Sequence, residues 1–282
     1  MNCNTFSKVY ITGGTGQLGK ELRKVLTRNE VSVTILSRQE VALNHNEVFK
    51  KFKLGEIPFS HESQDDVTFI HLAHDFYDHT PEKGNVNYTG LKLIVDSLKR
   101  IENKKIIYFS TPLLKNISHS IYQQQKVLGE LVVKEIDHLI LRPSFIYSEK
   151  GGANSIFNKL SKIGLSIPLP KNKNKISPIS LGAFTNFIYD QIFTKKNKGT
   201  LILKGLHDMT LQDFLRKYHR ISTFLIAPSI FNFVVKILNL HKSAFFYYQE
   251  RIIGIIKLED INEICKDEEF MQISEIKNRN NF

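Results

Sequence analysis

Two hydrophobic periods alternate through the first half of the chain. Short apolar runs have the composition of buried parallel strands, and the segments between them repeat apolar residues at helical spacing. The strand candidates are KVYIT (8–12), VSVTILSR (31–38), DVTFIHLAH (66–74), KKIIYFST (104–111) and HLILRPSFIY (138–147). The clearest helix candidates are TGLKLIVDSLKRI (89–101) and YQQQKVLGELVVKEI (122–136). Strands that alternate with helices predict an α/β fold with a doubly wound parallel sheet, covered by crossover helices on both faces.

The alternation weakens after about residue 150. Loops rich in Gly, Pro, Lys and Asn there separate short helix candidates such as TLQDFLRKYH (210–219). We therefore expect residues 1–150 to form the sheet domain. Residues 151–282 are expected to form a smaller mixed lobe, some segments of which return to the sheet.

Composition narrows the class of protein. Two cysteines cannot build a disulfide framework or a four-ligand zinc site, and no acid-and-histidine spacing matches a standard metal site, so we expect no metal. The most apolar stretch, 222–240, contains Pro228, Asn232 and Lys236, which favours a packed helix over a membrane span. The start of the chain has no long apolar core, so we expect a cytoplasmic protein.

The net charge of +11 is compatible with nucleic acid, an anionic membrane surface or small phosphorylated ligands. The lysines are spread along the chain, and PKNKNKIS (170–177) is the only short basic cluster. Charge alone therefore predicts no nucleic-acid partner.

A glycine-rich turn follows the first strand candidate. In TGGTGQLG (12–19), Gly13, Gly16 and Gly19 are spaced G-x-x-G-x-x-G, and a helical period begins directly after them. Glycine allows a tight turn and the close approach of backbone to a pyrophosphate, and the helix N-terminus offers free N–H groups. The alternative is a flexible turn, but the strand before it and the helix after it favour a dinucleotide site.

The end of the second strand indicates the type of dinucleotide. NAD sites usually have an acidic residue there, which binds the ribose hydroxyls. This chain has Ser37 followed by Arg38, and an arginine at that place can pair with a 2′-phosphate. The position therefore favours NADP(H) over NAD(H), although a surface arginine would give the same pattern.

Tyr122 and Lys126 lie four residues apart in a predicted helix, and therefore on one of its faces. Taken alone, this spacing is that of an ordinary amphipathic helix. Beside a nucleotide site it becomes a candidate acid/base pair, because a nearby ammonium lowers the pKa of a tyrosine from its usual value of ~10. Glu130, the next residue on that face, is interpreted as a partner of Lys126 or a surface residue.

Several motifs together resemble the extended short-chain dehydrogenase/reductase superfamily, in the branch that modifies nucleotide sugars. The resemblance extends from about residue 7 to 275. TGGTGQLG is similar to T-G-x-x-G-x-x-G, DVTFIHLAH to D-x-x-x-x-H-L-A, and NVNYTG to N-V-x-G-T. IIYFSTP is similar to the strand that bears the catalytic Ser or Thr, YQQQK to Y-x-x-x-K, and LILRPSFIY to L-R-P-x-x-x-Y.

The resemblance implies a Rossmann-type domain over residues 1–150, with the substrate lobe after it. It also implies the site residues. The expected catalytic residues are Tyr122, Lys126 and either Thr111, which we prefer, or Ser110. The expected cofactor-binding residues are Gly13, Thr15, Gly16, Gln17, Leu18, Gly19, Ser37, Arg38, Leu72, Ala73, Tyr122, Lys126 and Pro143. The expected substrate-binding residues are Asn154, Lys175, Ser177 and Arg251.

There are two departures from the family pattern. Ser148 stands where glycine is usual, and only ten residues separate Thr111 from Tyr122, about half the usual loop. The resemblance implies an NAD(P)-dependent enzyme that acts at C4 of a nucleotide sugar in surface polysaccharide synthesis, with 4-keto reduction favoured and 4-epimerisation as the alternative. It also implies a homodimer through helices 91–101 and 126–136. The rival of another class is a cofactor-binding sensor or scaffold without chemistry.

Overall fold

The computed structural model describes residues 8–59, 66–78, 80, 82–112, 121–148, 157, 161–162, 166–171, 174–195, 197–230 and 270–272. The chain divides into two compact units. The first contains residues up to Pro143 together with Leu181–Leu203, and the second contains Ser144–Ser180 and the residues from Lys204 onward. The functional division predicted near residue 150, between cofactor and substrate binding, stays a prediction.

The first unit is built on a parallel sheet. Its strands are β1 (Lys8–Thr12), β2 (Val33–Ser37), β3 (Glu47–Lys51), β4 (Val67–His71), β5 (Lys104–Phe109), β6 (His138–Pro143) and β11 (Gly199–Lys204). They lie in the order β14-β11-β6-β5-β4-β1-β2-β3, in which β14 (Phe270–Gln272) is a further strand at the edge, and all neighbours from β11 to β3 pair in parallel. The predicted doubly wound parallel sheet is confirmed, and its strand order reverses at β1, which pairs with both β2 and β4.

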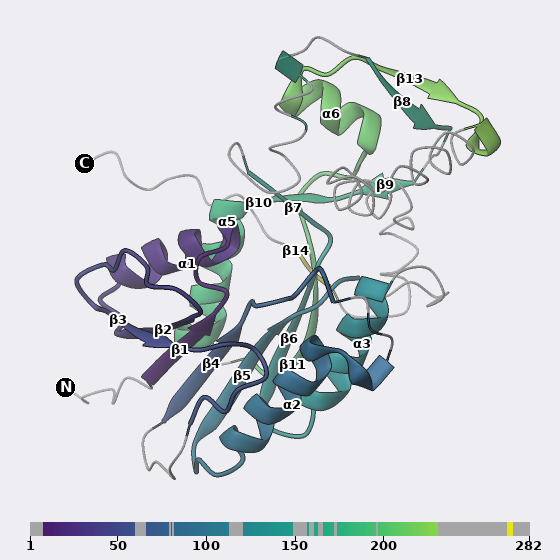
Figure 1. The fold of residues 1–282 in the computed structure, drawn as a ribbon. Coiled ribbons are helices and arrows are strands. Elements are labelled where there is room, and N and C mark those ends of the chain that lie inside the picture. The colour runs from purple at the N-terminus through teal and green to yellow at the C-terminus, as the bar shows by residue number, and fades with distance from the viewer. Residues whose placement is uncertain are drawn as a thin grey trace, which may run out of the picture. The chain divides into compact units, whose positions relative to one another are not determined.

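Helices cover both faces of this sheet (Figure 1). They are α1 (Gln17–Arg28), α2 (Val86–Leu98), α3 (Ile121–Val133) and α5 (Leu181–Tyr189), with short turns at η1 (Glu82–Gly84) and η2 (Asp190–Thr194). Helices α2 and α3 pack side by side on one face, and α1 and α5 on the other. The opposite placement of α1 relative to α2 and α3 follows from right-handed crossovers that run in opposite directions from β1.

The two cores of the sheet follow from the alternation of side chains along each strand. On β5, Ile106 and Tyr108 belong to the core under α2 and α3, with Leu91 and Ile94. Phe109 points the other way and meets Phe184 of α5, with ring centroids 6.0 Å apart.

The connection from β2 to β3, residues 38–46, contains no helix. A buried ion pair joins α1 to the start of β3. Arg23 of α1 donates from Nε to Glu47 Oε1 at 2.8 Å and from Nη2 to Glu47 Oε2 at 2.6 Å. Arg23 Nη2 also donates to the Ala42 carbonyl at 2.6 Å. The guanidinium therefore links α1 to both the connection and the start of β3.

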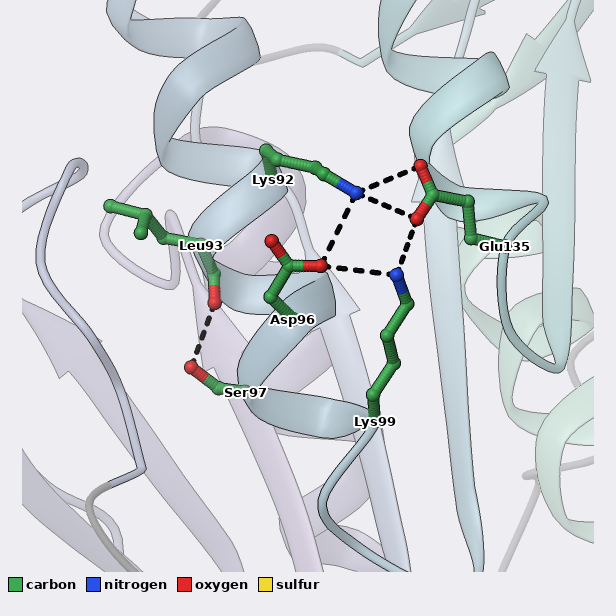
Figure 2. Close-up of polar contacts among 6 residues, drawn as sticks. All are labelled: Lys92, Leu93, Asp96, Ser97, Lys99 and Glu135. Atoms are coloured by element: carbon green, nitrogen blue, oxygen red, sulfur yellow. Dashed lines mark hydrogen bonds and ion pairs between the residues drawn. The ribbon is translucent and has the colours of Figure 1, made fainter.

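An exposed ionic network connects α2 with the turn after α3 (Figure 2). Lys92 and Lys99 both contact Asp96, at 3.2 and 3.1 Å, and both contact the carboxylate of Glu135. We call these four residues the α2–α3 network.

The second unit contains short strands and helix α6. Its elements are β7 (Phe145–Tyr147), β8 (Ile167–Pro170), β9 (Lys175–Ile176), β10 (Pro178–Ser180), β12 (Met209–Thr210), α6 (Leu211–His219), β13 (Thr223–Ile226) and β14 (Phe270–Gln272). Thr210 caps α6 by accepting a hydrogen bond from the Asp213 N–H at 3.1 Å. Phe214 of that helix is fully buried, and its ring meets the Phe145 ring edge to face.

Candidate active site

The glycine turn closes tightly between β1 and α1. Gly13 has φ +70°, a conformation that favours glycine, and a Cβ there would lie 2.7 Å from the Ala73 nitrogen. A Cβ at Gly19 would overlap the Gly13 carbonyl oxygen and lie 2.6 Å from the Gly14 Cα. The sequence therefore needs glycine at both positions for the backbone of α1, β1 and the end of β4 to approach.

Helix α1 begins without a side-chain cap. Gly16, its N-cap residue, makes no side-chain hydrogen bond, and the first turn contains no acidic residue. The free N–H groups and the helix dipole favour an anion at this terminus. Thr15 is exposed, and Gln17 and Leu18 open the helix. The turn thus fits the diphosphate of a dinucleotide.

The end of β2 contributes the two residues that bear on cofactor choice. Ser37 is its last residue and is half-buried, and Arg38 follows with its side chain exposed. Phe52, just after β3, donates its N–H to the Ser37 carbonyl at 2.9 Å, which fixes the backbone there.

The end of β4 lies against the glycine turn. Leu72 donates its N–H to the Thr12 carbonyl at 3.1 Å, and Leu72 and Ala73 border the space that Gly13 leaves open. His71 is buried, and its Nδ1 lies 2.9 Å from the Thr12 hydroxyl. Burial, together with the charge of Lys126, lowers the pKa of His71 to about 3. His71 is therefore neutral at physiological pH and serves in packing.

Tyr122 and Lys126 lie one turn apart on α3. Lys126 is only 4% exposed, whereas Tyr122 is half-buried. Lys126 Nζ lies 5.6 Å from the centre of the Tyr122 ring and 4.9 Å from the centre of the Tyr108 ring. Burial lowers the pKa of Lys126 to about 8. The ammonium is thus a partly desolvated charge beside the Tyr122 phenol, and this arrangement favours the phenolate.

Ser110 and Thr111 follow β5 at the same edge of the sheet. Ser110 is buried, and its Oγ has no hydrogen-bond partner among the described residues. Thr111 is half-buried. Of the two hydroxyls, that of Thr111 belongs to the more accessible residue.

Sequence reasoning missed a network around Tyr122. The side chain of Asn87 makes two hydrogen bonds to the backbone of Asp75. It accepts from the N–H at 2.7 Å and donates to the carbonyl at 2.9 Å. Gln125 accepts from Asn87 at 3.0 Å and donates to the Asp78 carbonyl at 3.0 Å. The segment 74–78 held by these bonds contains Phe76, whose ring stacks on that of Tyr122 with centroids 5.7 Å apart. His74 of the same segment meets the Tyr122 ring edge-on at 4.9 Å.

Of the two interpretations of Glu130 from sequence, that of a surface residue is wrong, whereas its charge does act on Lys126 by raising the pKa of that lysine. Glu130 is buried and accepts two hydrogen bonds from Arg142 of β6, from Nε at 2.9 Å and from Nη2 at 2.6 Å. A charged residue inside the apolar strand LILRP was the available signal, because a buried guanidinium needs a partner. Pro143, the next residue, ends β6 at the carboxyl edge of the sheet.

The predicted substrate residues lie in the second unit. Lys175 is exposed at the start of β9. Ser177 is fully buried, where its hydroxyl donates to Asp208 and its N–H donates to the Ser144 hydroxyl at 3.2 Å. These bonds give Ser177 a packing role within its unit. Asn154 and Arg251 lie outside the described residues.

Two kinds of feature are absent from the described part of the chain. No group of His, Cys, Asp and Glu there could hold a metal ion. None of its helices combines the length and apolar character that a membrane span requires.

Comparison with known proteins gives the fold. No protein-family model matches the chain, and no curated protein matches its sequence. Among solved structures, a dTDP-4-dehydrorhamnose reductase from Clostridium acetobutylicum is 19% identical with TM-score 0.64, over 79% of this chain and 85% of the other. The enzyme WbmH from Bordetella bronchiseptica, in complex with NAD+, is 16% identical with TM-score 0.62, and the match covers 79% of this chain and 86% of WbmH. A UDP-glucose 4-epimerase from Thermus thermophilus, in complex with NAD, is 15% identical with TM-score 0.60, over 78% and 87%. The chain therefore has the Rossmann-type α/β fold of these enzymes, as its resemblance to the extended short-chain dehydrogenase/reductases implies.

Proposed function

We propose that the chain is an extended short-chain dehydrogenase/reductase that reduces a 4-keto nucleotide sugar with NADPH. The observation that carries the proposal is the buried Lys126 ammonium beside the ring of Tyr122. A sensor or scaffold without chemistry has no need of a desolvated charge at a tyrosine, since burying a charge is costly. The similarity to a dTDP-4-dehydrorhamnose reductase supports this reaction class.

The residues of the first unit fit a nicotinamide dinucleotide. The backbone of Gly13, Gly16 and Gly19 would hold the diphosphate at the start of α1, where a Cβ would fill the turn. Leu72 and Ala73 would border the cofactor at the point where the strand order reverses. Lys126 would bind the nicotinamide ribose.

Proton transfer is the task of the protein in this reaction. When bound, NADPH would supply the hydride, with its electron pair, that the reduction of C4 requires. The hydroxyl of Tyr122 gives its proton to the C4 oxygen, so that the ketone becomes an alcohol. Lys126 stabilises the phenolate that remains, and water restores its proton. We favour Thr111 over the buried Ser110 as the hydroxyl that holds the sugar oxygen.

The choice of NADPH over NADH rests on Arg38. Its side chain is exposed after β2, and β2 ends in Ser37 instead of an acid. We expect Arg38→Ala to weaken NADPH binding about tenfold, because it removes one charge-assisted contact to the 2′-phosphate. Isothermal titration should show NADH affinity unchanged. Arg28→Ala, at an exposed arginine at the end of α1, is the matched control. Equal loss of both cofactors in Arg38→Ala would contradict the assignment.

A substrate test separates reductase from epimerase, the alternative supported by similarity to 4-epimerases. The purified protein should oxidise NADPH in equal amount to the sugar reduced when it is given dTDP-4-dehydrorhamnose or another 4-keto nucleotide sugar. If it instead retains NAD tightly and converts UDP-glucose to its C4 epimer without net oxidation, the reductase assignment is wrong. Cofactor binding without turnover of any of these substrates would favour the sensor or scaffold.

The remaining assignments concern the substrate and the cell. Asn154 and Arg251 are the proposed contacts to the nucleotide-sugar diphosphate, and Lys175, which is exposed on β9, is a further proposed substrate-binding residue. We place the reaction in the cytoplasm, where nucleotide sugars for surface polysaccharides are assembled, and propose a homodimer as the working form.

A further inference from the structure

Lys126 is charged in surroundings that disfavour charge. The side chain is buried, and burial is the largest influence on its pKa, which falls to about 8. The nearest carboxylate on its own helix, Glu130, raises this pKa only in part, and both Glu130 oxygens accept hydrogen bonds from Arg142. With a pKa of about 8, Lys126 is mostly protonated at pH 7, so the loss of one further stabilising contact would be enough to discharge it.

Neutral aromatic groups face Lys126 from the neighbouring elements. His71 of β4 is uncharged, because burial lowers its pKa to about 3. Burial raises the pKa of Tyr108 on β5, so its ring is a neutral phenol. The Tyr122 ring of α3 lies 5.6 Å from the ammonium, and the buried Glu130–Arg142 pair provides the other charged groups near it among the described residues.

The ring of Tyr108 is the closer of the two aromatic faces, with Lys126 Nζ 4.9 Å from its centre. Three contacts fix this ring. It stacks on His71, with centroids 6.1 Å apart and planes inclined by 11°. Its hydroxyl lies 3.5 Å from the Lys126 carbonyl oxygen, and it occupies the space left by the absent Cβ of Gly129. A ring held in this way over a desolvated ammonium stabilises the cation through its quadrupole.

We propose that Tyr108 is a positioning residue whose ring holds the Lys126 ammonium beside Tyr122 and keeps it protonated at neutral pH. This inference deepens the proposed function. The effect of Tyr108 on the charge of Lys126 does not depend on that function, but the consequence for the Tyr122 phenolate rests on it. The aromatic ring, and not the hydroxyl, stabilises the ammonium. Phenylalanine at this position should therefore preserve the effect on Lys126, whereas leucine should abolish it.

The ionisation of Lys126 tests this directly, without substrate. In protein labelled with ¹³C at lysine Cε, the Lys126 resonance is identified by its absence in Lys126→Met, and its pKa is measured by NMR titration. We expect Tyr108→Leu to lower this pKa by roughly half a unit to one and a half units. Tyr108→Phe should leave it near the wild-type value.

Phe109→Leu is the matched control, since it removes a buried ring from the same strand on the opposite face of the sheet, against Phe184. It should leave the Lys126 pKa unchanged. An unchanged pKa in Tyr108→Leu, or an equal fall in Tyr108→Phe or Phe109→Leu, overturns the proposal.

Turnover gives the second measurement. If the proposed reaction is correct, the decline of kcat/KM on the alkaline side should begin at lower pH in Tyr108→Leu, in step with the NMR shift. A shifted Lys126 pKa in a protein that reduces no 4-keto sugar would sustain the role of Tyr108 and reject the proposed function.

Discussion

At the scale of single residues, a substitution at Tyr122 is the most direct test of the proposed proton transfer. Tyr122→Phe deletes one hydroxyl and keeps the ring that stacks on Phe76. We expect turnover to fall by about 10²–10⁴, the usual contribution of a general acid, with cofactor affinity changed by less than about twofold. Stopped-flow kinetics and titration calorimetry measure the two quantities. Tyr77→Phe, at a tyrosine 80% exposed on the same segment, is the control. Near-normal turnover in Tyr122→Phe would reject the acid role.

The sequence identified the residues that belong to contiguous motifs. Gly13, Gly19 and the Tyr122–Lys126 pair were predictable, because a turn or one helical face brings such residues together. Tyr108, Gln125 and the pairing of Glu130 with Arg142 were not. Each depends on a contact between side chains of segments that are distant in sequence. The partners in such a contact, and the burial that shifts the pKa of a group such as Tyr108, cannot be read from a local pattern.

At the scale of elements, the α2–α3 network connects two helices through one carboxylate, Glu135. Hydrogen bonds from Lys92 and Lys99 lower the pKa of Glu135. Its contribution to stability is therefore present at neutral pH and is lost as the pH falls below about 4.

We expect Glu135→Gln to lower the melting temperature by about 1–3 °C at low salt, since exposed networks contribute ~0.5–1 kcal/mol. The difference should shrink in 0.5 M NaCl and at acidic pH, which thermal denaturation followed by circular dichroism can test. Glu21→Gln removes an exposed pair within α1 and should change little. A salt-independent loss would show that packing, not charge, stabilises the helix pair.

Element boundaries show where sequence patterns fail. The run expected as one strand over 138–147 is divided at Ser144 into β6 and β7, which belong to different units. Strand β3 was not predicted, because EVFKK lies at the sheet edge and buries little more than Glu47. Both β6 and β7 carry apolar residues, so periodicity alone could not separate them.

At the scale of the whole molecule, the predicted homodimer needs an outer surface on α2 and α3. Most apolar residues of these helices are already buried against the sheet, including Leu91, Ile94 and Val132. Leu131 is an exception at 60% exposed, and it lies four residues before Glu135 of the α2–α3 network. We expect the protein to sediment as a dimer at micromolar concentration and Leu131→Glu to sediment as a monomer, because a charge at a paired apolar site is disfavoured. A wild-type monomer would reject the assembly.

The space that Gly129 leaves for Tyr108 constrains how this protein can evolve. A Cβ at Gly129 would overlap the Tyr108 hydroxyl and approach its Cζ to 2.7 Å. Alanine at 129 becomes tolerable only after the strand residue has lost its ring, because phenylalanine would keep the close Cζ contact, and loss of the ring removes the aromatic face from Lys126. The two positions are thus expected to change together or not at all, and a lineage that exchanges both would have to find another means of keeping its lysine charged.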